Sequence, residues 1–404
     1  MTDRVFVTGM GIISSLGNGV NATLRALMAG ESGIEPVKFL DTEHRKLPVG
    51  EVKFTNEEMA QMLGAKYPEN ELRTVLMGIL AAKEAVASAK LTETDISKSA
   101  FINGTTVGGM DKTERHFKGA FEAGEIENPE IFELKYNDCG VSSELIADAV
   151  GKFKMVSTSS TACSSAANAM ILGANLIKAG VVDIVVAGGA EALTKFHLNG
   201  FNSLMILDPE PCRPFDEGRT GINLGEGAAY LVLESEASAK RRGVKVLAEL
   251  SGYANTCDAF HQTASSDNGE GAYLAMTKAM KMAGVDAAEI DYINAHGTGT
   301  PNNDQTELAA MKRIWGTKIP EFSSTKSFTG HTTSASGSIE TVICILALSN
   351  NFLPQNLGWK NPMEEGAMPV AESKEREVNN IINNSFGFGG NDSSLVFSKY
   401  KENE

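Results

Sequence analysis

The sequence predicts an α/β protein built from two related halves. Short apolar strands alternate with longer helices rich in small residues, which is the pattern of an α/β fold. The chain has 404 residues, more than a single hydrophobic core usually holds. The same order of elements also occurs twice along the chain, and such self-similarity is typical of a duplicated architecture.

The first half opens with an expected strand at residues 5–7, which leads into a glycine turn at residues 8–11. This turn resembles a dinucleotide-binding fingerprint. However, Ser14 stands where the third glycine would be, so a Rossmann cofactor site is only weakly indicated. A more polar and irregular segment at about 110–150 is interpreted as an insertion carried by this half.

The repeat is clearest in two strand–turn–helix units, one around Cys163 and one around His331. The strands are expected at 154–158 and 321–325, and the helices at 164–179 and 334–348. Each half then closes with a glycine turn and an apolar strand, GEGAAYLVLE at 225–234 and GFGGNDSSLVFS at 387–398. We therefore expect two domains, at residues 1–245 and 246–404.

The composition limits the classes of function. Apolar residues make up 42% of the chain and charged residues 22%, as in soluble globular proteins. The longest apolar runs, near 181–187 and 341–348, are too short for a bilayer span, and the start of the sequence is unlike a secretory leader. The net charge of −15 argues against a nucleic-acid partner. Five cysteines without a CxxC pair predict reduced thiols in the cytoplasm.

Cys163 lies in TSSTACSSA, a run of small residues at the turn between a strand and a buried helix. The N-terminus of such a helix favours a thiolate and can hold an oxyanion. Small neighbours leave space above the sulfur. Two interpretations remain open from this segment alone, a catalytic nucleophile and a buried structural cysteine.

Two of the six histidines occur in glycine-rich turns after expected strands, His296 in NAHGTGTPNND and His331 in STKSFTGHTTSASG. Sites in α/β proteins gather at the carboxyl ends of strands. If the halves are related, Cys163 and both imidazoles converge at one centre. No HxxxH or CxxC spacing accompanies them, so the sequence predicts that no metal is bound.

Seven motifs occur in the order known from one family: VTGMG, STACSSA, RPFDEGRTGINLGEGA, DAFHQT, NAHGTGTPNND, STKSFTGHTTSASG and NSFGFGGND. The chain resembles the β-ketoacyl-acyl carrier protein synthases, and within them the elongating branch that uses one cysteine and two histidines. The resemblance implies a thiolase-like, five-layered αβαβα fold and a homodimer. It implies decarboxylative Claisen condensation of a Cys-bound acyl group with malonyl-acyl carrier protein, without a cofactor, in fatty-acid or polyketide elongation.

The resemblance also implies roles for residues of this sequence. Cys163 would carry the acyl group, and His296 and His331 would stabilise the enolate formed from malonyl. Lys326 would act electrostatically, and Glu340 would orient the lysine region.

Further roles concern the substrate path. The backbone N–H groups of Cys163 and Phe388 would form the oxyanion hole. Phe388, between Gly387 and Gly389, would act as an aromatic gate. The remaining positions are the phosphopantetheine contacts Thr298, Thr300, His261 and Thr263 and the acyl-pocket residue Val107.

The sequence departs from the family pattern in two places. Asn391-Asp392 stands where the family commonly has threonine-asparagine. The basic patch expected to dock an acidic carrier protein is thin, with Lys66 and Arg73 near one end of the first half. Other cations that would supply it are Lys112, Arg115 and Lys118.

Three alternatives differ in what they require. A thiolase acting on coenzyme A esters needs a second reactive cysteine near the C-terminus, and residues 383–393 contain none. A chain-length-factor-like partner subunit resembles a synthase but lacks the nucleophile, which this chain has as Cys163. A cysteine hydrolase leaves the two-histidine pattern unexplained.

Overall fold

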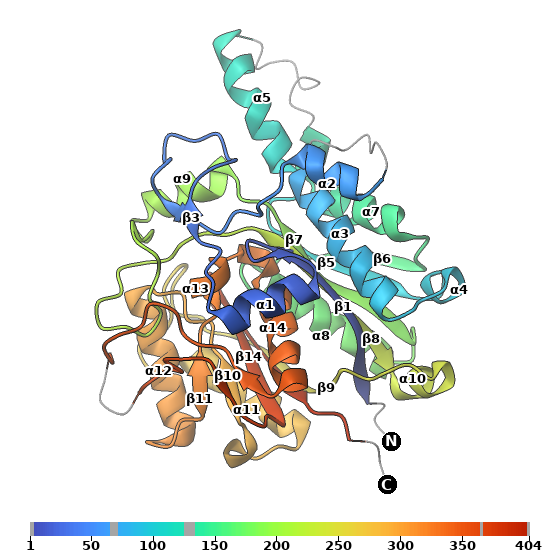
Figure 1. The fold of residues 1–404 in the computed structure, drawn as a ribbon, viewed down its shortest axis with the longest axis vertical. Helices are drawn as coiled ribbons and strands as arrows, with labels where there is room; N and C mark the ends of the chain where they lie inside the picture. Colours follow the sequence, from blue (N-terminus) through green and yellow to red (C-terminus); the bar gives the residue numbers. More distant parts are fainter. Residues whose placement is uncertain (1–3, 65–71, 125–133, 364–366, 402–404) are drawn as a thin grey trace.

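A computed structural model of the chain describes residues 4–64, 72–124, 134–363 and 367–401. Eleven of the described strands form one continuous sheet, which is covered by helices on both outer sides and contains two further helices at its centre (Figure 1). The layers are therefore helix, strand, helix, strand and helix, which confirms the predicted αβαβα architecture.

The order of the strands repeats between the two halves. From the centre outward the first half runs β1 (Val5–Ser14), β8 (Gly227–Ser235), β7 (Ile184–Glu191), β5 (Ala100–Gly104) and β6 (Met155–Ser159). The second half runs β9 (Ala248–Cys257), β15 (Asn391–Ser398), β14 (Asn380–Gly387), β10 (Tyr292–Asn294) and β11 (Glu321–Ser323).

The pairing directions repeat as well. In each half the two inner pairs are antiparallel and the two outer pairs are parallel. The halves join where β1 pairs with β9, at Phe6 with Glu249 and Val7 with Ala248. This shared topology confirms two pseudo-repeated halves, while the domain boundary between residues 245 and 246 stays a prediction.

Two central helices connect the halves, α8 (Ser165–Lys178) and α14 (Ser336–Asn350). Both contribute to the largest apolar cluster, together with strands of both halves. All residues of α14 are buried except its last two. A helix that is apolar on most faces is stable only when it is surrounded by protein, which accounts for its central place.

Each half has its own pair of helices in the outer layer. Helices α3 (Arg73–Ser88) and α7 (Cys139–Val150) cover the first half, and α11 (Glu270–Ala283) and α12 (Pro301–Trp315) cover the second. The remaining helical elements are α1 (Val20–Ala29), α2 (Asn56–Met62), α4 (Glu93–Ile96), α5 (Met110–Glu122), η1 (Leu134–Asn137), α9 (Lys195–Ser203), α10 (Glu236–Arg242), η2 (Ala287–Glu289), α13 (Lys326–Thr329) and η3 (Thr333–Ala335). The short strands are β2 (Gly17–Asn18), β3 (Glu35–Pro36), β4 (Pro48–Val49), β12 (Phe352–Leu353) and β13 (Lys374–Glu375). Among the described residues, no helix combines the length and the apolar character needed to cross a membrane.

The glycine turn expected after residues 5–7 is wrong, because β1 continues through Gly9 and Gly11 with only a bulge between Val7 and Gly9. These glycines instead permit close packing of α3. A Cβ atom on Gly11 would lie 2.1 Å from the Ala81 carbonyl oxygen. There is no loop here to hold a dinucleotide phosphate.

Helix α5 extends away from the body at one end of the long axis (Figure 1). By contrast, α7 packs on α3, and its Ile146 and Ala147 belong to the core. The polar segment predicted at about 110–150 therefore contains both a projecting helix and a helix of the outer layer. Its status as an insertion stays a prediction.

Candidate active site

The thiol is held at the turn between β6 and α8. Cys163 is 7% exposed, and Ala162 before it has a φ of 52°, a left-handed conformation that a non-glycine residue rarely adopts. The Ser165 hydroxyl donates to the Ala162 carbonyl (2.6 Å) and accepts from the Thr161 N–H (2.9 Å). The small residues predicted to surround the thiol therefore hold a tight turn at the N-terminus of a buried helix.

His331 enters the same space from the equivalent turn of the second half. Its Nε2 lies 3.0 Å from the Cys163 Sγ, and its Nδ1 lies 2.8 Å from the Ser336 hydroxyl. The His331 backbone N–H donates to the Asn223 carbonyl (2.7 Å), which fixes the turn against the segment before β8. The convergence predicted for the two turns is confirmed.

His296 follows β10 and faces the same centre. The Glu307 carboxylate accepts hydrogen bonds from the backbone N–H groups of His296 (2.9 Å) and Gly297 (2.8 Å), so α12 supports this turn. The imidazole rings of His296 and His331 lie 5.3 Å apart, nearly perpendicular to each other. Both rings are buried.

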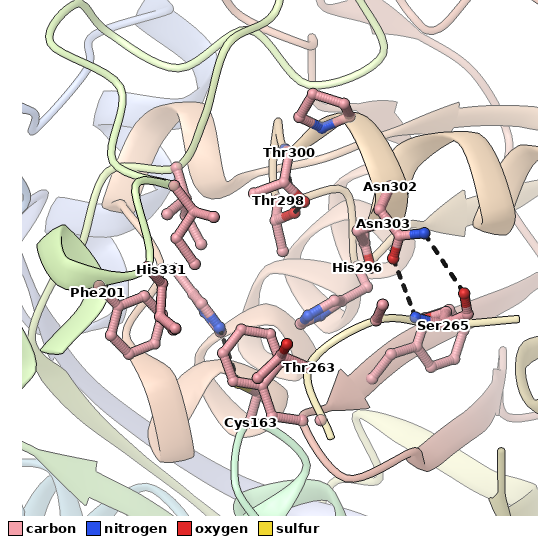
Figure 2. Close-up of a pocket in the computed structure, with 18 of the residues that line it drawn as sticks. Cys163, Phe201, Thr263, Ser265, His296, Thr298, Thr300, Asn302, Asn303 and His331 are labelled. Carbon is pink, nitrogen blue, oxygen red and sulfur yellow. Dashed lines mark hydrogen bonds between the residues drawn. The ribbon is translucent and has the colours of Figure 1, made fainter. Parts of the chain in front are cut away.

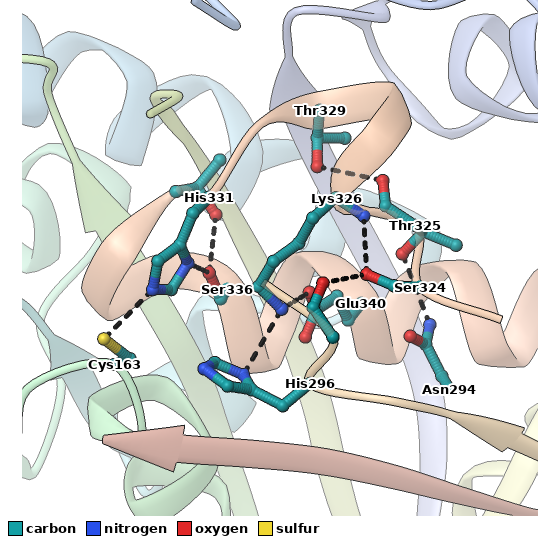
Figure 3. A network of polar contacts seen from close by, with 12 residues as sticks. Cys163, Asn294, His296, Ser324, Thr325, Lys326, Thr329, His331, Ser336 and Glu340 are labelled. Atoms are coloured by element: carbon teal, nitrogen blue, oxygen red, sulfur yellow. Dashed lines mark hydrogen bonds and ion pairs between the residues drawn. The ribbon is translucent and has the colours of Figure 1, made fainter. Parts of the chain in front are cut away.

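Lys326 connects His296 with Glu340 (Figure 3). Its Nζ lies 3.3 Å from the His296 Nδ1 and 2.5 Å from the Glu340 Oε1, and both charged side chains are fully buried. A lysine ammonium can only donate, so the Nδ1 of His296 accepts. The proton of this imidazole is therefore on Nε2, which faces the pocket as a donor.

Burial sets the protonation of the three groups. Burial lowers the pKa of both imidazoles well below its ordinary value, and the charge of Lys326 lowers it further, so both rings are neutral. Burial raises the pKa of the Cys163 thiol to about 11, against the opposing effects of the Lys326 charge and the Phe388 backbone N–H. The helix N-terminus was expected to favour thiolate. In the free protein desolvation is the larger effect, and the thiol stays protonated.

One thiol and two imidazoles also form a possible metal-ligand set, since their ligand atoms lie within 4.8 Å of one another. Imidazoles that bind metals usually donate their second N–H to a carboxylate or a carbonyl. Here the Nδ1 of His296 faces a lysine ammonium, which keeps the proton on the nitrogen that would have to bind the metal. The surroundings of the three ligands thus do not fit a metal.

Phe388 covers the pocket from the turn between β14 and β15. Its ring is 38% exposed and stacks on the ring of Phe201 in α9, with a centroid distance of 5.8 Å and an angle of 18°. Gly389 has a φ of 85°, which favours glycine, and a Cβ atom on Gly387 would lie 3.3 Å from the Cys163 N. The backbone N–H of Phe388 reaches the Cys163 sulfur, which agrees with the position expected of an oxyanion-hole donor.

The cavity above the thiol has a volume of about 430 Å³ (Figure 2). Thr298, Thr300 and Thr263 line it, as expected of contacts to a phosphopantetheine arm. Its wall does not include two other predicted residues. His261 is exposed, with its Nδ1 accepting from the Thr263 N–H, and Val107 is 2% exposed, with its N–H donating to Glu191.

Three residues of the site escaped the sequence analysis, namely Glu307, Ser336 and Phe201. Glu307 and Ser336 occur within or next to the motifs already singled out, and a polar residue at that spacing was the available signal. Phe201 carried no such signal, because its partner Phe388 is distant in sequence.

Asn391 accounts for one of the two departures from the family pattern. Its Oδ1 accepts from the Ser164 hydroxyl (2.7 Å) and the Asn168 side chain (2.8 Å), both at the start of the nucleophile's helix, and from Asn255 (2.7 Å). The hairpin that carries Phe388 is thereby attached to α8 beside Cys163.

The predicted docking patch is contradicted at two of its five residues, Arg73 and Lys112. Arg73 forms a buried ion pair with Glu226 (2.6 Å), and Lys112 is 7% exposed. Arg115 lies 3.5 Å from Asp111, and this pair is exposed only on the arginine side. Lys66 and the side chain of Lys118 lie outside the described residues.

This arrangement suits an enzyme that forms and condenses acyl thioesters, because a buried thiol faces two neutral imidazoles that line the same pocket. The chain belongs to the β-ketoacyl synthase family. Residues 2–239 match the description "Beta-ketoacyl synthase, N-terminal domain", and residues 247–360 match "Beta-ketoacyl synthase, C-terminal domain". The resemblance inferred from the seven motifs is therefore confirmed.

Similar proteins cover nearly the whole chain. A 3-oxoacyl-[acyl-carrier-protein] synthase 2 of Vibrio cholerae is 35% identical over 98% of this chain and 99% of its own length. The ishigamide ketosynthase/chain length factor structure is 33% identical with a TM-score of 0.93, over 99% of this chain and 100% of the other. A type II polyketide synthase acyl-carrier protein in complex with its ketosynthase bound to the hexaketide is 26% identical with a TM-score of 0.87, again over 99% and 100%.

Proposed function

We propose that the protein is an elongating 3-oxoacyl-[acyl-carrier-protein] synthase that condenses an acyl group on Cys163 with malonyl-acyl carrier protein. The observation that carries this proposal is the contact of the Cys163 Sγ with the His331 Nε2 at 3.0 Å, beside an Nε2–H donor on His296. The chain would need no cofactor, since the departing carboxylate of malonyl supplies the electrons.

The first step would transfer the acyl group. The Cys163 sulfur attacks the thioester carbon of the acyl carrier, and the carrier thiol leaves with the proton that Cys163 gives up. The N–H groups of Cys163 and Phe388 stabilise the oxyanion formed on the way. A protonated resting thiol keeps the buried site uncharged until a substrate arrives.

The second step would use the two histidines. Malonyl loses carbon dioxide, and the electron pair of the broken C–C bond forms an enolate whose charge lies on the thioester oxygen. The Nε2–H groups of His296 and His331 donate to that oxygen, and each donor contributes about 3 kcal/mol on the scale of oxyanion-hole deletions. The enolate carbon then attacks the acyl carbon, and the Cys163 sulfur leaves as a thiolate, which takes up a proton from solvent to restore the resting thiol.

Lys326 and Glu340 would hold this donor set in place. Lys326 donates to the Nδ1 of His296. The proton of this imidazole therefore stays on Nε2 and does not move to Nδ1. Glu340 compensates the lysine charge, since both side chains are buried.

The proposed partner is an acyl carrier protein, as in the related ketosynthase complex. A homodimer is supported by β6, an edge strand of the described sheet whose Val156 is 37% exposed. A cytoplasmic location is supported by five free cysteine thiols. The pathway, fatty-acid or polyketide elongation, depends on the acyl chain accepted.

The test is incubation of the protein with acyl carrier proteins that bear chains of different length, followed by malonyl carrier protein and intact mass spectrometry. The proposal expects the acyl mass on the Cys163 peptide and then a 3-oxoacyl product on the carrier. A protein that takes up no acyl group, or that only hydrolyses the thioester, would contradict it. A chain-length-factor-like role predicts the first of these failures, and a hydrolase predicts the second.

A further inference from the structure

Asp392 is the second residue of the Asn391-Asp392 pair that departs from the family pattern. The contacts of Asn391 do not account for it. It is the second residue of β15, directly after the turn 388–390, and its Cα pairs with Phe386 across the hairpin. It is only 3% exposed. A carboxyl group buried at the base of the hairpin that carries Phe388 requires either a cation or a proton.

Within the part of the chain that the structure describes, the groups that act on Asp392 include no cation. The charges that act on its carboxyl are Asp258, from the segment after β9, and Glu307, from α12. On the side of α11, Gly271 lies against it, since a Cβ atom there would be 2.0 Å from the Asp392 Oδ2 and 2.6 Å from the Asp258 Cβ. The acidic residue of that helix turn, Glu270, is paired with Arg313 at 2.8 Å. Burial and the two neighbouring carboxylates raise the pKa of Asp392 to about 7.

Asp258 belongs to the segment against which the gate rests. Its N–H donates to the Gly390 carbonyl (2.7 Å), and the Gly389 N–H donates to the Gln262 carbonyl (2.8 Å). The Asp258 carboxylate accepts from both the N–H and the hydroxyl of Ser266. The segment 258–266 is therefore bonded to the gate turn on one side and carries pocket-lining residues on the other.

We propose that Asp392 is a positioning residue whose proton holds the Phe388 gate closed, and whose ionisation favours opening by repulsion from Asp258 and Glu307. This inference rests on the proposed function and on the gate role that the family resemblance implies for Phe388. A neutral asparagine at this position would contribute no such dependence on pH. The aspartate makes the closed state bind a proton that the open, more hydrated state does not.

The sign and range of the effect follow from linkage. In the closed state the pKa of Asp392 is about 7, and in a hydrated open state it returns toward about 4. The closed state thus binds more protons, so rising pH shifts the equilibrium toward the open state between these two values and then has no further effect. The opening constant should rise about 20-fold between pH 5.5 and 7.5 and be level above pH 8.

Hydrogen–deuterium exchange of the substrate-free protein tests this proposal. After correction for the intrinsic pH dependence of exchange, residues 386–391 should lose protection by about 20-fold from pH 5.5 to 7.5, while β8 serves as the internal reference. D392N should reduce the change, and the part that remains belongs to Glu307, because burial raises the pKa of Glu307 to about 7 as well. D258N should keep it but move its midpoint to lower pH, because one of the two repelling carboxylates is gone.

Three results would overturn the proposal. They are an unchanged protection of residues 386–391 in the parent protein, a D392N variant with the same pH response as the parent, and a D258N midpoint that does not move. The exchange experiment needs no substrate. It is therefore independent of whether the protein condenses acyl and malonyl groups, which the mass-spectrometric assay decides separately.

Discussion

The Cys163 turn and the His331 turn occupy equivalent places in the two halves of the molecule. Each follows the outermost strand of its half, β6 or β11, and each leads into a central helix, α8 or α14. They meet at 3.0 Å, although one offers a sulfur and the other an imidazole. A duplicated topology has thus placed two different reactive groups face to face.

The two turns differ in length and in burial. Residues 160–162 separate β6 from Cys163, and the strand before them is partly exposed. Residues 324–330 separate β11 from His331, include the helix α13 with Lys326, and are entirely buried. The short turn leaves the sulfur open to a substrate, whereas the longer one provides a dry place for a charged lysine. The difference agrees with the proposal that one half holds the acyl group and the other stabilises charge.

The largest expected effect comes from a substitution in the Cys163 turn. Cys163→Ala removes the atom that bonds to the acyl group, so acyl transfer to the protein and condensation should both be abolished. Intact mass after incubation with acyl carrier protein measures the first and product analysis the second. Condensation that persists in this variant would refute the assignment of the nucleophile.

The second prediction concerns the His331 turn. His331→Ala removes a donor to the enolate oxygen and should lower malonyl decarboxylation about 10²- to 10³-fold. It should leave acyl loading of Cys163 in place, since the oxyanion hole is formed by backbone N–H groups. Release of carbon dioxide and acyl mass are measured in the same sample. Equal loss of both steps would show that the two turns do not divide the reaction as described.

The third prediction sharpens the account of the thiol. With a pKa of about 11, Cys163 should be alkylated by iodoacetamide about tenfold faster for each unit of pH up to about 10. A thiol of ordinary pKa, about 8.5, levels off above pH 9. The peptide that contains Cys163 is followed by mass spectrometry, with Cys257 as an exposed reference thiol. A rate that levels off near pH 8.5 would mean that the helix N-terminus outweighs burial.

The smallest effect concerns the stack between Phe201 and Phe388. An aromatic pair contributes about 0.5–1.5 kcal/mol beyond the area it buries, so Phe201→Ala should raise hydrogen exchange of residues 386–391 about two- to tenfold. Phe201→Leu, which keeps apolar bulk without the ring, is the matched control and should show most of the effect of the lost stacking. Unchanged exchange in both variants would show that the stack does not hold the gate.

Local patterns predicted much of the fold and of the site. The strand–turn–helix units around Cys163 and His331 were recognisable because each lies within one continuous segment. The turn expected at Gly9 and Gly11 was wrong, because glycine also permits a helix to approach a strand, and sequence does not distinguish the two uses.

The sequence could not predict contacts between distant segments. It also could not predict how desolvation and nearby charges balance within the site. The rings of Phe201 and Phe388 stack only in the folded chain, because the two residues are distant in sequence. Arg73 forms a buried ion pair with Glu226 and is therefore not a docking residue. The protonation of Cys163 depends on whether desolvation or the nearby positive charges prevail, and that requires the burial of the folded state.

The central claim is that the second half can decarboxylate malonyl without a reactive sulfur in the first. Cys163→Gln tests it most directly, because the amide occupies the place of the acylated cysteine but cannot accept an acyl group. Carbon dioxide release from malonyl-acyl carrier protein should be retained or increased in this variant, with no condensation product. Loss of decarboxylation to the level of His331→Ala would contradict the division of the reaction between the two turns.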